Sequence, residues 1–380
     1  MAEGPNPNKE RDVATSPLHQ VSQLGQSLWI DYLSREFVAS GDLDRMIDED
    51  ALAGLTSNPT IFEKAIAAGD SYDEQIRELS ETTDDPKEIF LGLAVRDVCD
   101  ACHVLRRVWD EGGGEDGYVS LEVDPRFAYD AEATFREALR LHAWVDEPNL
   151  LVKIPATKPG LAAIEDVVFK GHSVNVTLIF SLTRYLEVAE SYVRGLERLV
   201  AAGGDPSKVA SVASFFVSRV DTEVDRRLDE IGGRKQLKGR LAIANARLAY
   251  QLYKEKFSGE RWEFLASKGA SPQRCLWAST SVKDPAYPDT MYVDELIGPH
   301  TVNTMPEETI EAFQDHGRAE LTLERGIDEA RRLFDELDSA GVDYADVTDV
   351  LEREGVQKFA DSFDQLIAGL EDKRGALVAA

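Results

Sequence analysis

Short apolar segments recur along the chain, and stretches with helical periodicity lie between them. The clearest segment is residues 149–154, NLLVKI, in which four apolar residues surround Lys153 and prolines stand on either side. A strand that is buried on both faces is typical of a parallel sheet covered by helices. We identify eight strands of this kind, at residues 27–34, 53–60, 118–125, 149–154, 172–181, 207–218, 274–280 and 298–306.

The alternation of strands and helices predicts an α/β fold. Such alternation implies right-handed crossovers and a parallel sheet, and eight units favour a closed (β/α)8 TIM barrel. An open, doubly wound sheet is the alternative, but it usually carries a glycine-rich phosphate loop after its first strand, and this chain has none there. The chain is helical from Pro306 onward, with expected breaks at Gly326, Gly341 and Gly355, so we expect extra helices, notably at the C-terminus.

The ends of the chain suggest a simple domain organisation. Residues 1–20 are polar and contain proline, and they predict a disordered tail without a signal peptide. Residues 21–380 then form a single barrel domain that includes the C-terminal helices, with residues 237–257 as an insertion in the pattern. No apolar run is long enough to span a membrane, and we expect a cytoplasmic protein. The C-terminal helices could cap the barrel or pack on a second copy in a homo-oligomer.

The chain is strongly acidic, with 42 Lys and Arg against 70 Asp and Glu and a formal net charge of −28. This charge argues against nucleic acid as a partner. It also opposes anionic substrates at long range. A substrate that carries a phosphate would therefore need a local group of arginines or lysines.

Lys153 is the most informative single residue, because lysine is rarely buried without a reason. Burial disfavours the ammonium form, and a neutral amine is a nucleophile that can form a Schiff base with a carbonyl substrate. The alternatives are a lysine whose amine reaches solvent from the strand end, or one half of a buried ion pair. The strand alone leaves these interpretations open.

Polar residues at the other strand ends favour the Schiff base. In a TIM barrel the active site is built at the C-terminal ends of the strands. Carboxylates there could transfer the protons that imine chemistry requires, and the scattered histidines offer no metal site. We therefore expect a Schiff-base aldolase or transferase without metal or cofactor. The strand-end residues are Asp31, Thr56, Ser57, Asn58, Glu122, Lys153, Asn175, Thr177, Ser214, Phe216, Arg219, Ser279, Thr280, Ser281, Lys283 and Asn303.

Several of these segments together resemble the transaldolase family, over roughly residues 27–305. The motifs are LTSNPTIF (55–62), SLEVDPR (120–126), LLVKIPAT (150–157), NVTLIFS (175–181), SFFVSRV (214–220) and LWASTSVKDP (276–285). The resemblance implies a class I aldolase-like barrel with its Schiff-base lysine on the fourth strand. Our independent count also puts Lys153 on strand four.

The resemblance also implies roles for individual residues. Lys153 forms the Schiff base with the ketose donor, and Asp31 takes the proton of the donor hydroxyl when the carbon–carbon bond breaks. Glu122 acts through a water molecule, held partly by Thr177, in the carbinolamine and imine steps. The implied substrate-binding residues are Asn58, Asn175, Ser214, Phe216, Arg219 for the phosphate and Lys283 as a second cation.

The implied reaction moves a dihydroxyacetone unit from sedoheptulose 7-phosphate to glyceraldehyde 3-phosphate, giving erythrose 4-phosphate and fructose 6-phosphate. This reaction belongs to the non-oxidative pentose phosphate pathway. One alternative is an aldolase that hydrolyses the intermediate instead of passing it on. Another is a barrel that binds sugar phosphates without turning them over.

Overall fold

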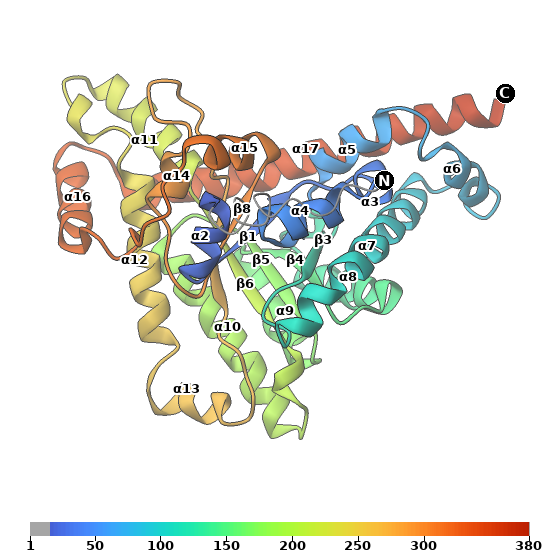
Figure 1. Ribbon diagram of the computed structural model, residues 1–380, viewed down its shortest axis with the longest axis horizontal. Helices are drawn as coiled ribbons and strands as arrows, with labels where there is room; N and C mark the ends of the chain where they lie inside the picture. Colours follow the sequence, from blue (N-terminus) through green and yellow to red (C-terminus); the bar gives the residue numbers. More distant parts are fainter. Residues whose placement is uncertain (1–15, 380) are drawn as a thin grey trace, which may run out of the picture.

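Eight parallel strands form a closed barrel in chain order in the computed structural model, which describes residues 16–379 (Figure 1). The predicted α/β fold of the TIM-barrel type is therefore confirmed. The strands are β1 (Gln26–Asp31), β2 (Leu52–Thr56), β3 (Tyr118–Glu122), β4 (Leu150–Pro155), β5 (Val174–Ile179), β6 (Ser211–Phe216), β7 (Arg274–Ala278) and β8 (Thr301–Met305).

Helices surround the barrel, and many begin at a polar cap directly after a strand. Asn58, Thr157 and Ser181 each accept a backbone N–H of the following helix, which satisfies donors that a helix start leaves free. The helices are α2 (Pro17–Gln23), α3 (Arg35–Ala39), α4 (Asp42–Asp50), α5 (Pro59–Ala67), α6 (Asp73–Ser80), α7 (Pro86–Glu111), α8 (Ala131–Val145), α9 (Lys158–Phe169), α10 (Leu182–Ala201), α11 (Ser218–Ile231), α12 (Leu241–Lys256), α13 (Gly259–Ala266), α14 (Met291–Asp294), α15 (Glu307–His316), α16 (Ile327–Ser339) and α17 (Tyr344–Ala379).

Three expectations about the elements need correction. Of the expected tail, residues 1–15 lie outside the described residues, but residues 17–20 belong to α2, which buries Leu18 and Val21. The expected insertion at 237–257 forms α12, which contacts β7 and α10 and so belongs to the helical layer of the barrel. The strand expected at 207–218 starts only at Ser211, because Asp205 caps a 3-10 turn over Pro206–Lys208.

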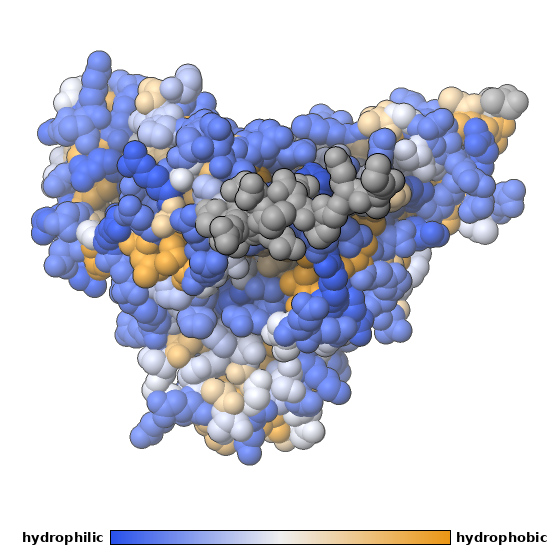
Figure 2. Space-filling view, viewed as in Figure 1, coloured by the Kyte–Doolittle hydropathy of each residue, from blue (hydrophilic) through white to orange (hydrophobic). Residues whose placement is uncertain are grey.

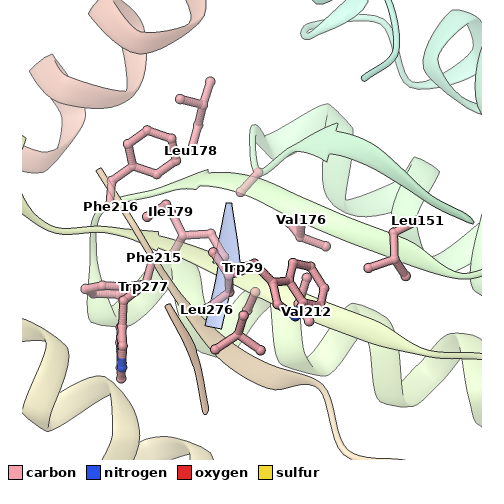
Figure 3. Packing of buried hydrophobic residues seen from close by; sticks show 14 of the residues in the cluster. Trp29, Leu151, Val176, Leu178, Ile179, Val212, Phe215, Phe216, Leu276 and Trp277 are labelled. Carbon is pink, nitrogen blue, oxygen red and sulfur yellow. The ribbon is translucent and has the colours of Figure 1, made fainter. Parts of the chain in front are cut away.

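Large side chains fill the barrel interior below the strand ends. Trp29 of β1 faces Gly54 of β2, where a Cβ atom would lie 2.5 Å from the indole ring. Figure 3 shows Trp29, Val212 and Leu276 lying close together. Since all three are almost fully buried, the interior of the barrel at this level is a packed core.

The long helix α17 crosses the barrel from the side of α11 and α16 to the side of α5 and α6 (Figure 1). Gly326 caps α16 and Gly341 precedes α17, as expected for breaks. The break predicted at Gly355 is wrong, because this glycine lies inside α17. A Cβ atom there would lie 3.1 Å from Leu178. The glycine therefore allows the helix to approach β5 closely.

Hydrophilic residues cover most of the face shown in Figure 2, in keeping with the acidic composition. Along residues 16–379, the structure contains no helix that is both long enough and apolar enough to cross a membrane.

Candidate active site

Lys153 lies on β4 and extends across the interior of the barrel. Its side chain is buried, with the residue only 6% exposed. Its Nζ donates a hydrogen bond of 2.9 Å to the backbone carbonyl of Ser57, 96 residues earlier in the chain. The strand register puts Glu122 of β3 beside it on one side and Asn175 of β5 on the other. The lysine is therefore shielded from solvent, and it forms no direct ion pair within the part of the chain that the structure describes.

Glu122 is the buried carboxylate of the site. It is 9% exposed, and its Oε2 has no hydrogen-bond partner among the described residues. Burial raises the pKa of the Glu122 carboxyl to about 7, against the opposing effect of Lys153 and with a further contribution from Asp31. A carboxyl group that changes protonation near neutral pH suits proton transfer in both directions. Thr177 of β5 also has a buried hydroxyl, and no side chain or backbone group of residues 16–379 hydrogen-bonds to it.

Asp31 ends β1, which lies two strands from the β3 strand of Glu122 in the barrel order. Its Oδ1 accepts a hydrogen bond of 2.7 Å from Thr56, whose hydroxyl also lies 2.8 Å from that of Thr304. Asp31 contributes to the electrostatic environment of both Glu122 and Arg219. The two carboxylates thus belong to one site but have different surroundings. Asp31 accepts a hydrogen bond from a hydroxyl, whereas Glu122 keeps one oxygen without a partner among the described residues.

Polar side chains of β3, β5 and β6 form a buried hydrogen-bonded row next to Lys153. Ser214 Oγ donates to Asn175 Oδ1 at 2.6 Å, and Asn175 Nδ2 donates to Ser120 Oγ at 3.0 Å. The carbonyl oxygen of Asn175 is therefore occupied, whereas its amide has a second N–H to offer a ligand. These contacts fix the orientation of the amide beside the lysine.

Asn58 lies after β2 and is held by its capping role. Its Oδ1 accepts the backbone N–H of Ile61 at 3.1 Å, at the start of α5. The capping bond leaves the amide N–H groups of Asn58 for other contacts.

Arg219 and Phe216 form the β6 side of the site. The Arg219 guanidinium lies 5.1 Å from the centre of the Phe216 ring, and that ring lies 5.2 Å from Phe180. Burial lowers the pKa of Arg219, with Asp31 opposing that effect. Within residues 16–379 Arg219 makes no ion pair with a carboxylate. A half-buried arginine without a counter-ion is suited to bind an anion.

Within residues 16–379, Lys283 is hydrogen-bonded only in its own loop. It is exposed in the loop after β7, and its Nζ donates to Ser281 Oγ at 2.6 Å. The structure thus brings the strand-borne residues and Arg219 to one end of the barrel, but among the described residues Lys283 forms no hydrogen bond or ion pair with any of them.

Three contacts of the site are absent from the sequence prediction. The Ser57 carbonyl binds Lys153, Ser120 binds Asn175, and Thr304 of β8 contacts Thr56. Asn303, the residue predicted at the end of the eighth strand, accepts a hydrogen bond from Thr280. Ser120 lies two residues before Glu122, so strand alternation could have found it. The Ser57 carbonyl belongs to the backbone, which is the same in every residue, so no pattern of residue types could have predicted its contact with Lys153.

The arrangement defines a class of protein. A closed (β/α)8 barrel with a buried lysine beside a carboxyl group at the C-terminal ends of its strands has the architecture of a barrel enzyme, with these groups where such enzymes place their active sites.

Comparisons with known proteins name the family. The family model described as Transaldolase/Fructose-6-phosphate aldolase matches residues 28–370. A transaldolase of Frankia alni is 52% identical over 364 residues, which cover 95% of this chain and 98% of that protein. A transaldolase of Acidothermus cellulolyticus is 52% identical over 358 residues, covering 94% and 96% of the two chains. The chain belongs to the transaldolase/fructose-6-phosphate aldolase family, which confirms the resemblance of its motifs.

Proposed function

We propose that the protein is a transaldolase. It transfers a dihydroxyacetone unit from sedoheptulose 7-phosphate to glyceraldehyde 3-phosphate and releases erythrose 4-phosphate and fructose 6-phosphate. The reaction is reversible and belongs to the non-oxidative pentose phosphate pathway, in the cytoplasm. Relatives that are about 50% identical and are named transaldolases support this activity.

Lys153 is the nucleophile of the proposed mechanism. Its Nζ attacks the ketose carbonyl carbon to give a carbinolamine, which loses water to form the protonated imine. The imine withdraws electrons, so the adjacent carbon–carbon bond breaks while Asp31 takes the proton of the donor hydroxyl and the aldose leaves. The remaining enamine then attacks the second aldose. Reversal of the imine steps frees the product and restores the lysine.

Glu122 handles the protons of the imine steps, through a water molecule that Thr177 also holds. The support for this role is the pair of buried, unpartnered oxygen atoms on these two side chains. A pKa of about 7 lets Glu122 give a proton to the leaving hydroxyl and take one back during hydrolysis.

The remaining residues bind the substrate. Asn175 and Asn58 donate amide N–H groups to the hydroxyls of the dihydroxyacetone fragment, Ser214 orients Asn175, and Phe216 forms a wall of the pocket. Arg219 binds the phosphate, because it is a cation without a carboxylate partner in residues 16–379. Lys283 is the second cation, and its exposed position makes its part the weaker one.

The buried lysine beside Glu122 carries the proposal, and covalent trapping tests it. The protein is incubated with fructose 6-phosphate, reduced with borohydride and mapped by peptide mass spectrometry. We expect a reduced dihydroxyacetone adduct on Lys153 alone, and an adduct on another lysine would contradict the mechanism. Adding erythrose 4-phosphate separates the two activities named by the family, because a transaldolase forms sedoheptulose 7-phosphate whereas an aldolase releases dihydroxyacetone.

A barrel that only binds sugar phosphates would give neither product. The expected homo-oligomer stays a prediction, as does the single domain over residues 21–380.

A further inference from the structure

The loop between β7 and α14, residues 279–290, is attached to α11 at its start. Val217 and Ser218 donate backbone N–H groups to the carbonyls of Ala278 and Ser279, at 2.9 and 3.0 Å. The hydroxyls of Ser218 and Ser279 lie 3.0 Å apart. Arg219 is the next residue of α11, so the base of this loop is directly joined to the turn that carries the candidate phosphate-binding arginine.

A tyrosine attaches the far end of the loop to the same helix. Tyr287 donates to Asp225 Oδ2 at 2.6 Å, and Asp225 Oδ1 accepts the backbone N–H of Gly239 at 3.0 Å. Gly239 has φ +64°, and a Cβ atom there would lie 2.6 Å from the Tyr287 ring. The ring therefore packs directly against Gly239, and any larger residue at this position would displace the ring.

These attachments share one face of α11. Ser218, Asp221 and Asp225 are spaced by three and four residues, which puts them in one row on a helix. Asp221 accepts a hydrogen bond from Tyr292 of α14 at 2.9 Å. The loop is thus held at Ser279 and Tyr287, and the helix that follows it is held at Tyr292. Residues 283–286, between the two loop attachments, are exposed and include Lys283.

We propose that Tyr287, through Asp225, is a positioning residue that holds Lys283 near the phosphate end of the site. This inference rests on the proposed function for the identity of the phosphate as part of a sugar substrate. A loop attached at both ends loses less conformational entropy when Lys283 closes on an anion than a loop attached at one end. The hydroxyl of Tyr287 therefore contributes to phosphate affinity without contacting the substrate.

Tyr287→Phe tests this role, because it keeps the ring over Gly239 and removes only the hydroxyl. We expect the KM for fructose 6-phosphate to rise about three- to tenfold, the net contribution of one hydrogen bond, with kcat and the KM for unphosphorylated fructose little changed. The dissociation constant of inorganic phosphate, measured by calorimetry, should rise by the same factor. Tyr250→Phe is the matched control, since it loses a tyrosine hydrogen bond to Pro299, before β8.

A double-mutant cycle identifies the path of the effect. If Tyr287 acts through Lys283, adding Tyr287→Phe to Lys283→Ala should weaken phosphate binding no further. Additive losses, equal losses on both sugars, or no loss of phosphate affinity in Tyr287→Phe would each overturn the inference. Absence of transfer activity in the wild type would instead refute the proposed function, while the phosphate titration would still test the role of Tyr287.

Discussion

Two buried charged clusters lie at opposite ends of the barrel, and they differ in how completely their polar atoms are paired. At the N-terminal end of the strands, Arg274 donates to Ser27 Oγ at 2.9 Å and to Asp116 Oδ1 at 2.9 Å. It also donates to the Glu115 carbonyl at 2.6 Å. Asp116 in turn accepts hydrogen bonds from Ser27 and from Trp29 Nε1. Both charges of this cluster are compensated by several partners.

At the C-terminal end, pairing is incomplete. Lys153 has one hydrogen bond, to a carbonyl, while Glu122 and Thr177 each keep a buried oxygen without a partner in residues 16–379. A buried polar group without a partner costs stability. Among the described residues, unpartnered oxygens of uncharged side chains also occur near the N-terminal strand ends, at Gln26 and Gln273, so the distinguishing feature is an unpaired oxygen on a carboxyl group beside a lysine. The comparison teaches that the pairing of a buried charge, and not burial alone, separates the structural cluster from the proposed catalytic one.

Replacing Lys153 by arginine should have the largest effect on turnover. Arginine keeps a positive charge beside Glu122 but cannot form an imine under these conditions. We expect activity to fall by more than about a thousandfold, with no adduct after borohydride reduction. Lys158→Arg is the control, because Lys158 is a 72% exposed side chain five residues further on. Normal turnover of Lys153→Arg would show that the cluster at the C-terminal strand ends does not carry the catalysis.

Glu122→Gln should have the next largest effect, a loss of about 10²–10⁴-fold that is typical of a general acid–base group. Adduct formation itself should slow, and the inflection near pH 7 expected in the wild-type profile of kcat/KM should disappear. Asp31→Asn is the matched variant, since it should form the adduct but fail to cleave the carbon–carbon bond. Loss at the same step in both variants would contradict the separate roles of the carboxylates.

The same glutamate should make stability depend on pH. The folded protein holds the Glu122 proton up to about pH 7, whereas the unfolded chain releases it near the ordinary value of 4.5. Because the folded state binds more protons between these values, this residue lowers the free energy of unfolding as pH rises through that range. The measurement is the free energy of urea unfolding of Glu122→Gln minus that of the wild type. This difference should be more positive at pH 8 than at pH 4.5.

Arg219→Ala should have a smaller and more selective effect. A hydrogen bond to a charged group contributes roughly 1.5–3 kcal/mol, or about ten- to a hundredfold in affinity. The ratio of catalytic efficiencies on fructose 6-phosphate and fructose should fall by that factor, and less in Lys283→Ala. Equal loss on both sugars would make Arg219 a structural residue like Arg274.

Arg274→Met should have the smallest effect on turnover. It leaves Asp116 without its charged partner, and removing one member of a buried pair typically costs about 3–5 kcal/mol of stability. We expect a lower urea midpoint with kcat per folded molecule unchanged. A catalytic loss as large as that of Glu122→Gln would show that the two ends of the barrel do not differ in the way proposed.

The strand-borne part of the site could be predicted because strands follow a local rule. A polar residue inside an apolar strand, such as Lys153 or Asn175, is visible in the sequence, and alternation shows which residues share a face. Glycine patterns were less reliable, as Gly341 ends a helical segment whereas Gly355 lies inside α17. The two differ in what packs against them, and the sequence does not contain that information locally.

The sequence by itself determined the eight strands, the lysine on the fourth of them and most of the polar residues at their ends, because these depend on patterns of neighbouring residues. Only the tertiary structure decided that the Ser57 carbonyl binds Lys153 and that Glu122 keeps an unpaired oxygen. It also decided that Tyr287 reaches Asp225. These contacts join residues far apart in the chain, or involve backbone atoms that every residue carries, so they arise only when the barrel closes.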